Sequence, residues 1–281
     1  PNWSAAFFAI TVYGRIAIPM LPELSAGEVE NILVHSEAKA IFVSKKQLPK
    51  LSAEAIGRLK LVIAIGDLSF IKAEGSSYTC DGKVSRPTAL DTAAILYTSG
   101  TTGKAKGVML CHRNFCTNVL TSWYSYKIGP RDVFLSILPM AHTYEMSIGM
   151  LYPFAMGAKV EYLQKVPTPS ILIATLAKIR PTAMLSVPLI IEKIYRSSIV
   201  PTISKSKFLS YLDKHAKGLL YTMVGMKLKK TFGGRIGFFG IGGAKLDPEV
   251  EVFLKKARFP YAIGYGLTET APLLCSAAPR R

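Results

Sequence analysis

The residues best suited to chemistry in this sequence lie in one stretch, residues 95–108. An apolar run at 93–97 is typical of a buried strand, and it gives way abruptly to hydroxyl residues and glycines. Glycine lets a backbone approach a ligand and aim its N–H groups at it, while hydroxyls and lysines add donors and positive charge. The stretch therefore predicts a loop that grips a polyphosphate. The residues concerned are Thr98, Ser99, Gly100, Thr101, Thr102, Gly103, Lys104, Lys106 and Gly107.

Two other glycine-rich nucleotide motifs do not fit. A Walker loop requires a second glycine five positions after Gly100, and this sequence has Ala105 there. A dinucleotide fingerprint starting at Gly264 fails because its third glycine is replaced by Glu269. A flexible linker is the non-functional alternative for a run of Ser, Thr and Gly, but a linker needs no buried strand before it.

The stretch resembles the signature of the adenylate-forming superfamily, which includes acyl-CoA synthetases, luciferases and peptide-synthetase adenylation domains. The usual form of that signature is Thr-Ser-Gly-Thr-Thr-Gly-x-Pro-Lys-Gly, and the one departure here is Ala105 in place of proline. Three later segments resemble further superfamily motifs in the expected order: 139–145 around His142, the Gly-Gly-Ala turn at 242–244, and 264–270. The segment 186–195, which is followed by a basic insert, resembles the long-chain fatty acyl branch of the superfamily.

The resemblance implies ATP-dependent activation of a long-chain fatty acid to an acyl-adenylate, followed by transfer of the acyl group to coenzyme A. It implies Mg²⁺ as the cation, with oxygen ligands from Thr98 and Glu269. Residues 99–106 would hold the β- and γ-phosphates, and His142 would line the acyl carboxylate and the path of the thiol. The catalytic candidates are thus Thr98, His142 and Glu269. The remaining candidates, for adenine and the α-phosphate, are Gly242, Gly243, Ala244, Tyr265, Gly266 and Thr268.

Alternative interpretations stay open at several of these positions. A lone histidine at a strand-to-helix junction is often a local hydrogen-bonded cap, and residues 242–244 also suit an ordinary turn before an N-cap at Asp247. Within the superfamily, a fatty acyl-AMP ligase or another adenylating enzyme would pass its product to a carrier protein instead of coenzyme A. The sequence leaves the acyl-chain length and the oligomeric state open.

Alternating strand and helix patterns predict an α/β fold, with mostly parallel sheets and flanking helices, forming part of the large N-terminal domain of an adenylate-forming enzyme. We expect a first α/β part at 1–71, a polar loop at 72–91 and a nucleotide-binding α/β part at 92–281, with the last strand at 261–265. The superfamily's ribose-binding aspartate, hinge and C-terminal domain have no counterpart in the chain. The resemblance therefore implies a partial domain whose activity belongs to a longer parent enzyme.

The chain is strongly basic, with 35 Lys and Arg against 18 Asp and Glu, which favours anionic partners. Seven lysines lie in 205–230, against the single acid Asp213, over an apolar spacing that predicts one amphipathic helix. Such a helix suits either peripheral contact with anionic lipid or a solvated face over a core-facing stripe. A non-catalytic membrane-binding protein is thus the alternative of another class. The apolar positions are Phe208, Leu212, His215, Leu219 and Met223.

Two further patterns bear on the cellular compartment of the protein. No run of about twenty apolar residues predicts a transmembrane helix, and the four cysteines include no Cys-x-x-Cys pair, which is typical of free thiols in a reducing compartment. We therefore predict a cytoplasmic protein, with peripheral contact at the inner membrane surface as one reading of residues 205–230. Nucleic acid is not a predicted partner, because no nucleic-acid motif accompanies the charge.

Overall fold

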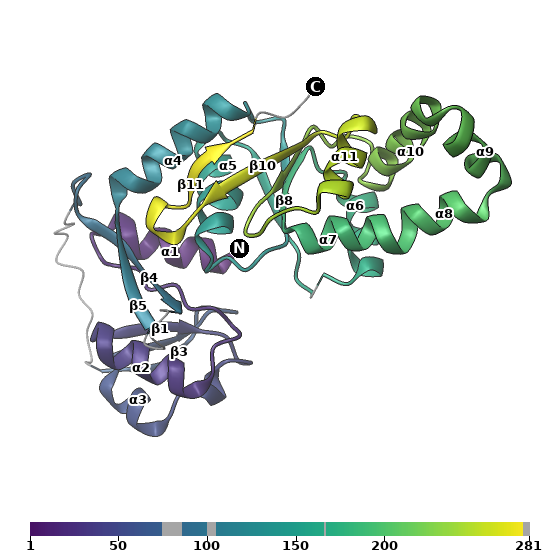
Figure 1. The fold of residues 1–281 in the computed structure, drawn as a ribbon. Coiled ribbons are helices and arrows are strands. Elements are labelled where there is room, and N and C mark those ends of the chain that lie inside the picture. Colours follow the sequence, from purple (N-terminus) through teal and green to yellow (C-terminus); the bar gives the residue numbers. More distant parts are fainter. Residues whose placement is uncertain (75–85, 100–104, 166, 278–281) are drawn as a thin grey trace. The chain divides into compact units, whose positions relative to one another are not determined.

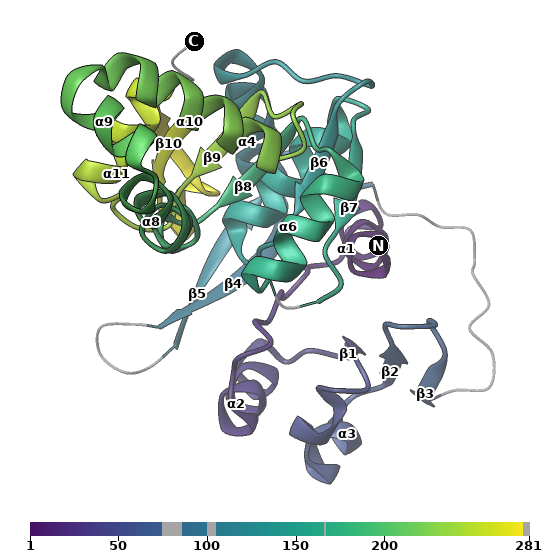
Figure 2. The ribbon, with the colours of Figure 1, turned by 90° about the vertical axis from the view of Figure 1, so that its right-hand side faces the viewer.

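A computed structural model describes residues 1–74, 86–99, 105–165 and 167–277. The chain forms two compact units, each described here by itself. The first unit comprises Pro1–Asn114 and Pro139–His142, and the second comprises Phe115–Leu138 and Thr143–Arg281. Figure 1 and Figure 2 give the order of the elements along the chain.

A three-stranded sheet lies in the first unit. Its strands β1 (Ala40–Val43) and β2 (Leu61–Ala64) are parallel, and β3 (Phe70–Ala73) pairs with β2 in the antiparallel direction. The helices α1 (Asn2–Val12), α2 (Ala26–Ser36) and α3 (Ala53–Arg58) and the short η1 (Leu48–Lys50) complete this part. A capping box begins α2, because the Glu28 backbone N–H donates to the Ser25 hydroxyl and the Ser25 N–H donates to the Glu28 carboxylate.

The predicted phosphate stretch forms a hairpin. Strand β4 (Thr92–Ser99) pairs in the antiparallel direction with β5 (Ala105–Cys111), and α4 (His112–Ser125) follows directly. Figure 2 shows this hairpin as a long two-stranded ribbon. The expected strand before the loop is confirmed, but the sequence analysis missed β5, because the polar and glycine-rich start of that strand suggests a loop. Its regular structure comes from cross-strand pairing with β4, which the composition of β5 does not reveal.

The second unit is built on a six-stranded sheet in the order β11-β10-β9-β8-β6-β7. Five strands run parallel, as expected, and only β11 is antiparallel. Residues 261–265 are not the last strand, because the chain returns beside β10 as β11. Central strand β8 is buried along its whole length, consistent with helices on both faces. The strands are β6 (Val133–Ser136), β7 (Lys159–Tyr162), β8 (Ala183–Ser186), β9 (Phe238–Ile241), β10 (Tyr261–Gly266) and β11 (Leu273–Ser276).

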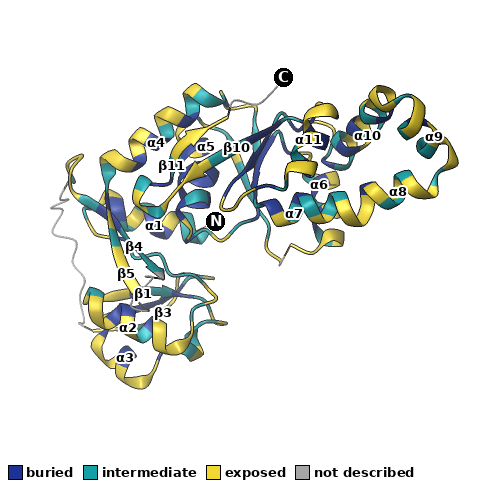
Figure 3. Ribbon diagram, viewed as in Figure 1, coloured by how far each residue is buried: buried dark blue, intermediate teal, exposed yellow. Residues whose placement is uncertain are grey.

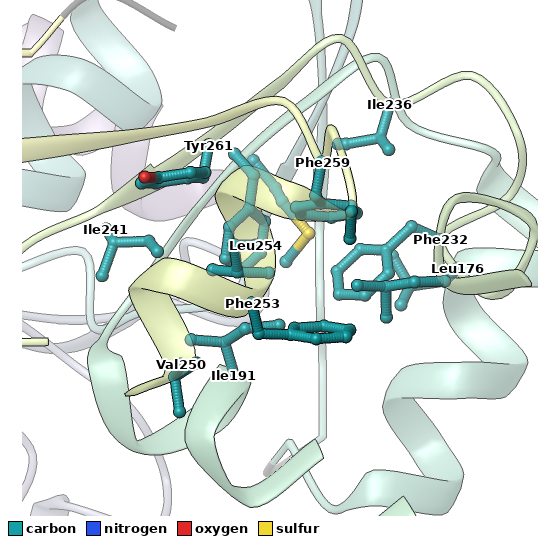
Figure 4. Packing of buried hydrophobic residues seen from close by; sticks show 14 of the residues in the cluster. Leu176, Ile191, Phe232, Ile236, Ile241, Val250, Phe253, Leu254, Phe259 and Tyr261 are labelled. Carbon is teal, nitrogen blue, oxygen red and sulfur yellow. The ribbon is translucent and has the colours of Figure 1, made fainter. Parts of the chain in front are cut away.

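The largest core cluster of the second unit packs helices α6 (Pro169–Ile179) and α11 (Pro248–Lys256) against β8, β9 and β10 (Figure 4). Phe232, Phe239 and Phe259 meet edge to face within it, with ring centroids 5.2 to 5.5 Å apart. The predicted N-cap of α11 is confirmed: the Glu249 backbone N–H donates to the Asp247 carboxylate at 2.8 Å.

Residues 205–230 do not form one helix. The chain between β8 and β9 runs through α7 (Pro188–Ile194), a π-helical turn η3 (Tyr195–Ile199), α8 (Val200–Lys205), α9 (Lys207–His215) and α10 (Lys217–Thr231). The breaks fall at Ser206, whose hydroxyl accepts from the N–H of Leu209, and at Ala216, whose φ of −147° is not helical. The predicted apolar stripe is therefore divided between two helices. No helix among the residues described is both long and apolar enough to cross a bilayer.

Candidate functional site

The β4–β5 hairpin brings together two of the predicted phosphate residues. Thr98 lies directly opposite Lys106, and Ser99 lies opposite Ala105. Because opposed residues of an antiparallel pair share one side of the ribbon, the Thr98 hydroxyl and the Lys106 ammonium project to the same side. Lys106 is thus a strand residue and not a loop residue. Five further candidates, Gly100, Thr101, Thr102, Gly103 and Lys104, lie outside the described residues.

The same hairpin is tied to helix α2 by a contact that the sequence analysis missed. The Tyr97 hydroxyl lies 2.7 Å from His35 Nδ1, and the two rings meet edge on. Opposite Tyr97 stands Gly107, where a Cβ would lie only 2.9 Å from the Ile95 side chain. Gly107 is therefore required by packing within the hairpin, in addition to any approach of a ligand. Residues 62 positions apart meet here, and no local pattern identifies that pair.

His142 lies in the segment 139–142, which follows β6. Its backbone N–H donates to the Pro139 carbonyl at 3.0 Å, which closes a tight turn. Burial lowers the pKa of the imidazole, because desolvation disfavours the charged form. His142 is consequently neutral at pH 7 and keeps a ring nitrogen able to accept a hydrogen bond.

In the second unit, the predicted adenine segments lie at one edge of the sheet. Strands β9 and β10 are parallel neighbours with Ile241 opposite Ile263, so the turn that starts at Gly242 and the end of β10 at Tyr265 lie side by side. This is the carboxyl edge, where open α/β sheets bind ligands. Gly243 has a φ of +85°, a left-handed conformation that favours glycine. The structure thus brings Gly242, Gly243 and Ala244 together with Tyr265 and Gly266.

Tyr144 packs against this turn, although the sequence analysis assigned it no role. A Cβ on Gly242 would lie 3.0 Å from the Tyr144 ring, and a Cβ on Gly240 would lie 3.0 Å from its hydroxyl. The two glycines therefore leave room for the tyrosine ring. Burial raises the pKa of Tyr144, so its hydroxyl stays protonated at every physiological pH. Its place within the 139–145 motif was the only signal that could have identified it.

A buried asparagine holds the segment that carries Thr268 and Glu269. These residues belong to the short helix η4 (Thr268–Thr270), which follows β10. Asn118 on α4 donates from Nδ2 to the Thr270 carbonyl at 2.8 Å, and its Oδ1 accepts from the Leu273 N–H at 2.8 Å. One side chain thereby fixes the backbone on both sides of the turn. Asn118 lies 152 positions from Thr270 and gives no signal in the sequence.

We expect Asn118→Ala to lower the free energy of unfolding by about 2 kcal/mol, because two backbone groups lose their partner next to a buried cavity. Urea unfolding followed by circular dichroism measures the change. Thr117→Ala, an exposed substitution on the same helix, is the matched control and should stay within about 0.5 kcal/mol. Equal midpoints for the two variants would show that Asn118 does not hold η4.

An apolar cavity of about 40 Å³ lies beside this edge of the sheet. Tyr144 lines it and also contacts Gly242, so this side chain stands between the cavity and the turn. Of the helix that follows His142, only Ile148 lines the cavity, while Met146 and Met150 are buried outside its lining. The helix is the π-helical η2 (Glu145–Leu151), and a single face of it meets the cavity. Further lining residues are Ser122, Tyr152, Phe238 and Leu273.

The magnesium assignment stays a prediction. Thr98 lies in the first unit and Glu269 in the second. Among the described residues, no group of three His, Cys, Asp or Glu side chains could hold a metal ion. Mg²⁺ bound with a nucleotide needs no such group, because substrate phosphates and waters supply most of its ligands. A hydroxyl and one carboxylate therefore fit the chemistry of that cation.

The AMP-binding enzyme family matches residues 1–281, which is the whole chain. This chain belongs to that family. The long chain acyl-CoA synthetase 6, peroxisomal, of Arabidopsis thaliana is 31% identical over 96% of the AMP-binding chain and 43% of its own length. The chain thus spans less than half the length of this curated relative.

Solved structures confirm the fold expected from the sequence. The O-succinylbenzoate coenzyme A synthetase of Bacillus subtilis, in complex with AMP, has a TM-score of 0.72 at 18% identity, covering 99% of the AMP-binding chain and 61% of that protein. A long-chain-fatty-acid-CoA ligase of Archaeoglobus fulgidus has a TM-score of 0.71 at 19% identity. The match covers 99% of the AMP-binding chain and 52% of that ligase. The α/β architecture is that of the N-terminal domain of adenylate-forming enzymes.

Proposed function

We propose that the protein containing this chain is a ligase that joins a long-chain fatty acid to coenzyme A, with ATP cleaved to AMP and pyrophosphate. The observation that carries the proposal is the position of Tyr144, between the glycine turn at Gly242 and the apolar cavity. An adenylate on the turn and an acyl chain in an apolar site would meet at this side chain. The similarity to a long chain acyl-CoA synthetase supports a fatty acid as the substrate.

In the first step, a carboxylate oxygen of the fatty acid attacks the α-phosphorus of ATP. A C–O–P linkage forms, the bond from the α-phosphorus to the bridging oxygen breaks, and pyrophosphate leaves with the electron pair. Two anions must approach each other, so donors and cations must be in place before the reaction. Lys106 and the Thr98 hydroxyl, which project to one side of the hairpin, are suited to the departing phosphates. Thr98 and Glu269 would be the protein ligands of Mg²⁺, which would supply positive charge to the departing phosphates.

In the second step, the thiolate sulfur of coenzyme A attacks the acyl carbon, a thioester forms and AMP leaves. His142 is assigned to this path, and its neutral imidazole could accept the thiol proton. Gly243 and Ala244, which are exposed beside the Tyr144-covered Gly242, would give adenine a backbone surface, and the exposed Tyr265 ring offers a face for stacking. The cytoplasmic location remains a prediction, and the Arabidopsis relative is described as peroxisomal.

The test is a calorimetric titration of the chain with non-hydrolysable adenylates that carry either a long fatty acyl or an amino acyl group. We expect the fatty acyl compound to bind more tightly, because an apolar tail gains free energy in an apolar site. Equal affinity for both would contradict the fatty-acid assignment. Tighter binding of the amino acyl compound would place the substrate in another class. Turnover by the parent protein is then measured as acyl-CoA formed per ATP consumed.

A further prediction concerns the role of Lys106 in binding the phosphates of ATP. Lys106→Gln should weaken ATP binding to the chain about tenfold or more, since a charge-assisted hydrogen bond contributes about 1.5–3 kcal/mol. Calorimetry with ATP and Mg²⁺ provides the dissociation constants. The control is Lys45→Gln, the same loss of charge at an exposed position in the same unit. Dissociation constants for the Lys106 variant and the control that agree within a factor of two would remove Lys106 from the phosphate site.

A further inference from the structure

The insert between β8 and β9 carries a basic surface that the proposed reaction does not use. We define this surface as the exposed side of α9 and α10 together with the end of α8. Figure 1 shows these three helices extending beyond the sheet of the second unit, and Figure 3 shows how much of them is exposed. Asp213 is the one acid in this segment. The lysines are Lys205, Lys207, Lys214, Lys217, Lys227, Lys229 and Lys230.

The charge of these lysines is not neutralised within the unit. No ion pair joins any of the seven to an acidic side chain in the part of the chain that the structure describes. Six of them are exposed, and only Lys229 is half-buried. Neighbouring Arg196, by contrast, pairs with Asp247 at 2.6 Å. The surface thus presents a concentrated positive charge to a partner outside the unit.

Helix α9 displays aromatic side chains between these charges. Phe208 is 58% exposed and Tyr211 is 61% exposed, whereas Leu212 is buried. At 100° per residue, Lys207, Phe208, Tyr211 and Lys214 fall within one face about 120° wide. The Tyr211 ring also packs against the His215 ring at 4.6 Å, which keeps both on the outer side. Aromatic and basic side chains therefore share the solvent-facing side of the helix.

Helix α10 adds aliphatic side chains to the same surface. Leu219 is 54% exposed and Met226 is 61% exposed, and the two are seven residues apart, so they lie on one face. A neighbouring side of the helix, about 100° round from Met226, is held tightly, because a Cβ on Gly225 would lie 2.1 Å from the Ala257 carbonyl. Close packing against the end of α11 fixes which side of α10 faces outward. The apolar exposure is therefore a property of the fold and not of a loosely attached helix.

This combination identifies the kind of partner. A nucleic acid would be recognised by lysine with arginine and stacking aromatics, but 205–230 contains no arginine, and Leu219 and Met226 offer nothing to a base. An anionic bilayer attracts lysines through its headgroups and accepts aromatic and aliphatic side chains at the acyl boundary. We propose that the basic surface docks the protein on an anionic membrane. The proposal does not rest on the ligase function, although a bilayer is where a long-chain fatty acid dissolves.

The contribution of the lysines to membrane binding is tested by co-sedimentation. The chain is sedimented with phosphatidylcholine vesicles, with and without 30 mole per cent phosphatidylserine. We expect binding only to the anionic vesicles and weaker binding as salt increases. Lys207→Gln combined with Lys214→Gln should reduce the partition coefficient about thirtyfold. Lys45→Gln combined with Lys46→Gln removes the same charge from exposed positions of the first unit and should leave binding within about threefold. Equal losses in the two double variants would overturn the proposal.

The apolar contribution needs its own variant, because charge alone does not distinguish a bilayer from another polyanion. Phe208→Ser combined with Tyr211→Ser should weaken vesicle binding at least tenfold with the net charge unchanged. Phe70→Ser, at a 67% exposed phenylalanine of β3, should have no effect. Circular dichroism spectra that match the parent chain confirm that each variant folds. A single-stranded RNA that carries the same concentration of negative charge as the anionic vesicles serves as the other polyanion. Binding to this RNA in the absence of vesicle binding would overturn the membrane assignment.

Discussion

Phe239→Ala is expected to lower the free energy of unfolding by about 3–5 kcal/mol, which is the usual cost of deleting a fully buried phenylalanine. Its side chain is 0% exposed at the centre of β9. The centroid of its ring lies 5.3 Å from that of Phe232 and 5.5 Å from that of Phe259, both edge to face. Each such pair adds to the free energy gained by burying the side chain. Because β9 ends at the Gly242 turn, the same substitution should also weaken nucleotide binding.

Guanidinium unfolding followed by tryptophan fluorescence and by circular dichroism measures this effect. Phe208→Ala removes the same atoms in the same unit from a side chain that is 58% exposed, so it should cost less than about 1 kcal/mol. Equal losses for the two variants would show that the aromatic cluster does not dominate the stability of the sheet.

The second large effect expected is a fall in stability as the pH rises, caused by Glu145. This residue opens the π-helix η2, and its side chain is 0% exposed. Its carboxylate lies over Gly149, where a Cβ would stand 2.7 Å from the carboxyl carbon. Neither carboxylate oxygen makes a hydrogen bond of good geometry to any residue that the structure describes. Burial in this position disfavours the charged form.

Burial therefore raises the pKa of Glu145 from its ordinary 4.5 to about 8, although the Ser136 hydroxyl and the backbone N–H groups of Ile137 and Leu138 act in the opposite direction. Between pH 4.5 and pH 8 the folded chain binds a proton that the unfolded chain has lost. Unfolding then releases a proton, so the free energy of unfolding falls by up to about 1.4 kcal/mol for each pH unit in that window. Outside the window this residue contributes no slope.

Glu145→Gln should remove this dependence, because an amide of the same shape has no charge to bury. Urea unfolding at pH 5, 6, 7 and 8 measures it. The advantage of the glutamine variant over the parent should grow by up to about 3 kcal/mol across the series. Glu249→Gln is the matched control at an exposed position of the same unit, where glutamine can still accept from Tyr195. Parallel curves for the parent and the Glu145 variant would show that Glu145 is charged when buried.

The sequence by itself determined the features that depend on neighbouring residues. The capping box at Ser25 and Glu28 needs residues three apart, and the N-cap at Asp247 needs residues two apart. Strand β4 was located by the apolar run at 93–97, which gives way to hydroxyl residues and glycines. The family was recognised from motifs, because each motif is a continuous segment with a fixed pattern of residues. The parallel direction of the second sheet followed from the alternation of strands and helices.

The tertiary structure decided what depends on residues far apart in the chain. Strand β5 exists because β4 supplies its partners, and the basic stretch is divided because Ser206 caps a new helix and Ala216 leaves the helical conformation. Asn118 reaches Thr270 across 152 positions, and Tyr144 covers Gly242 from another element. Hydrogen bonds and close packing of this kind depend on positions in space, which a pattern of neighbouring residue types does not contain.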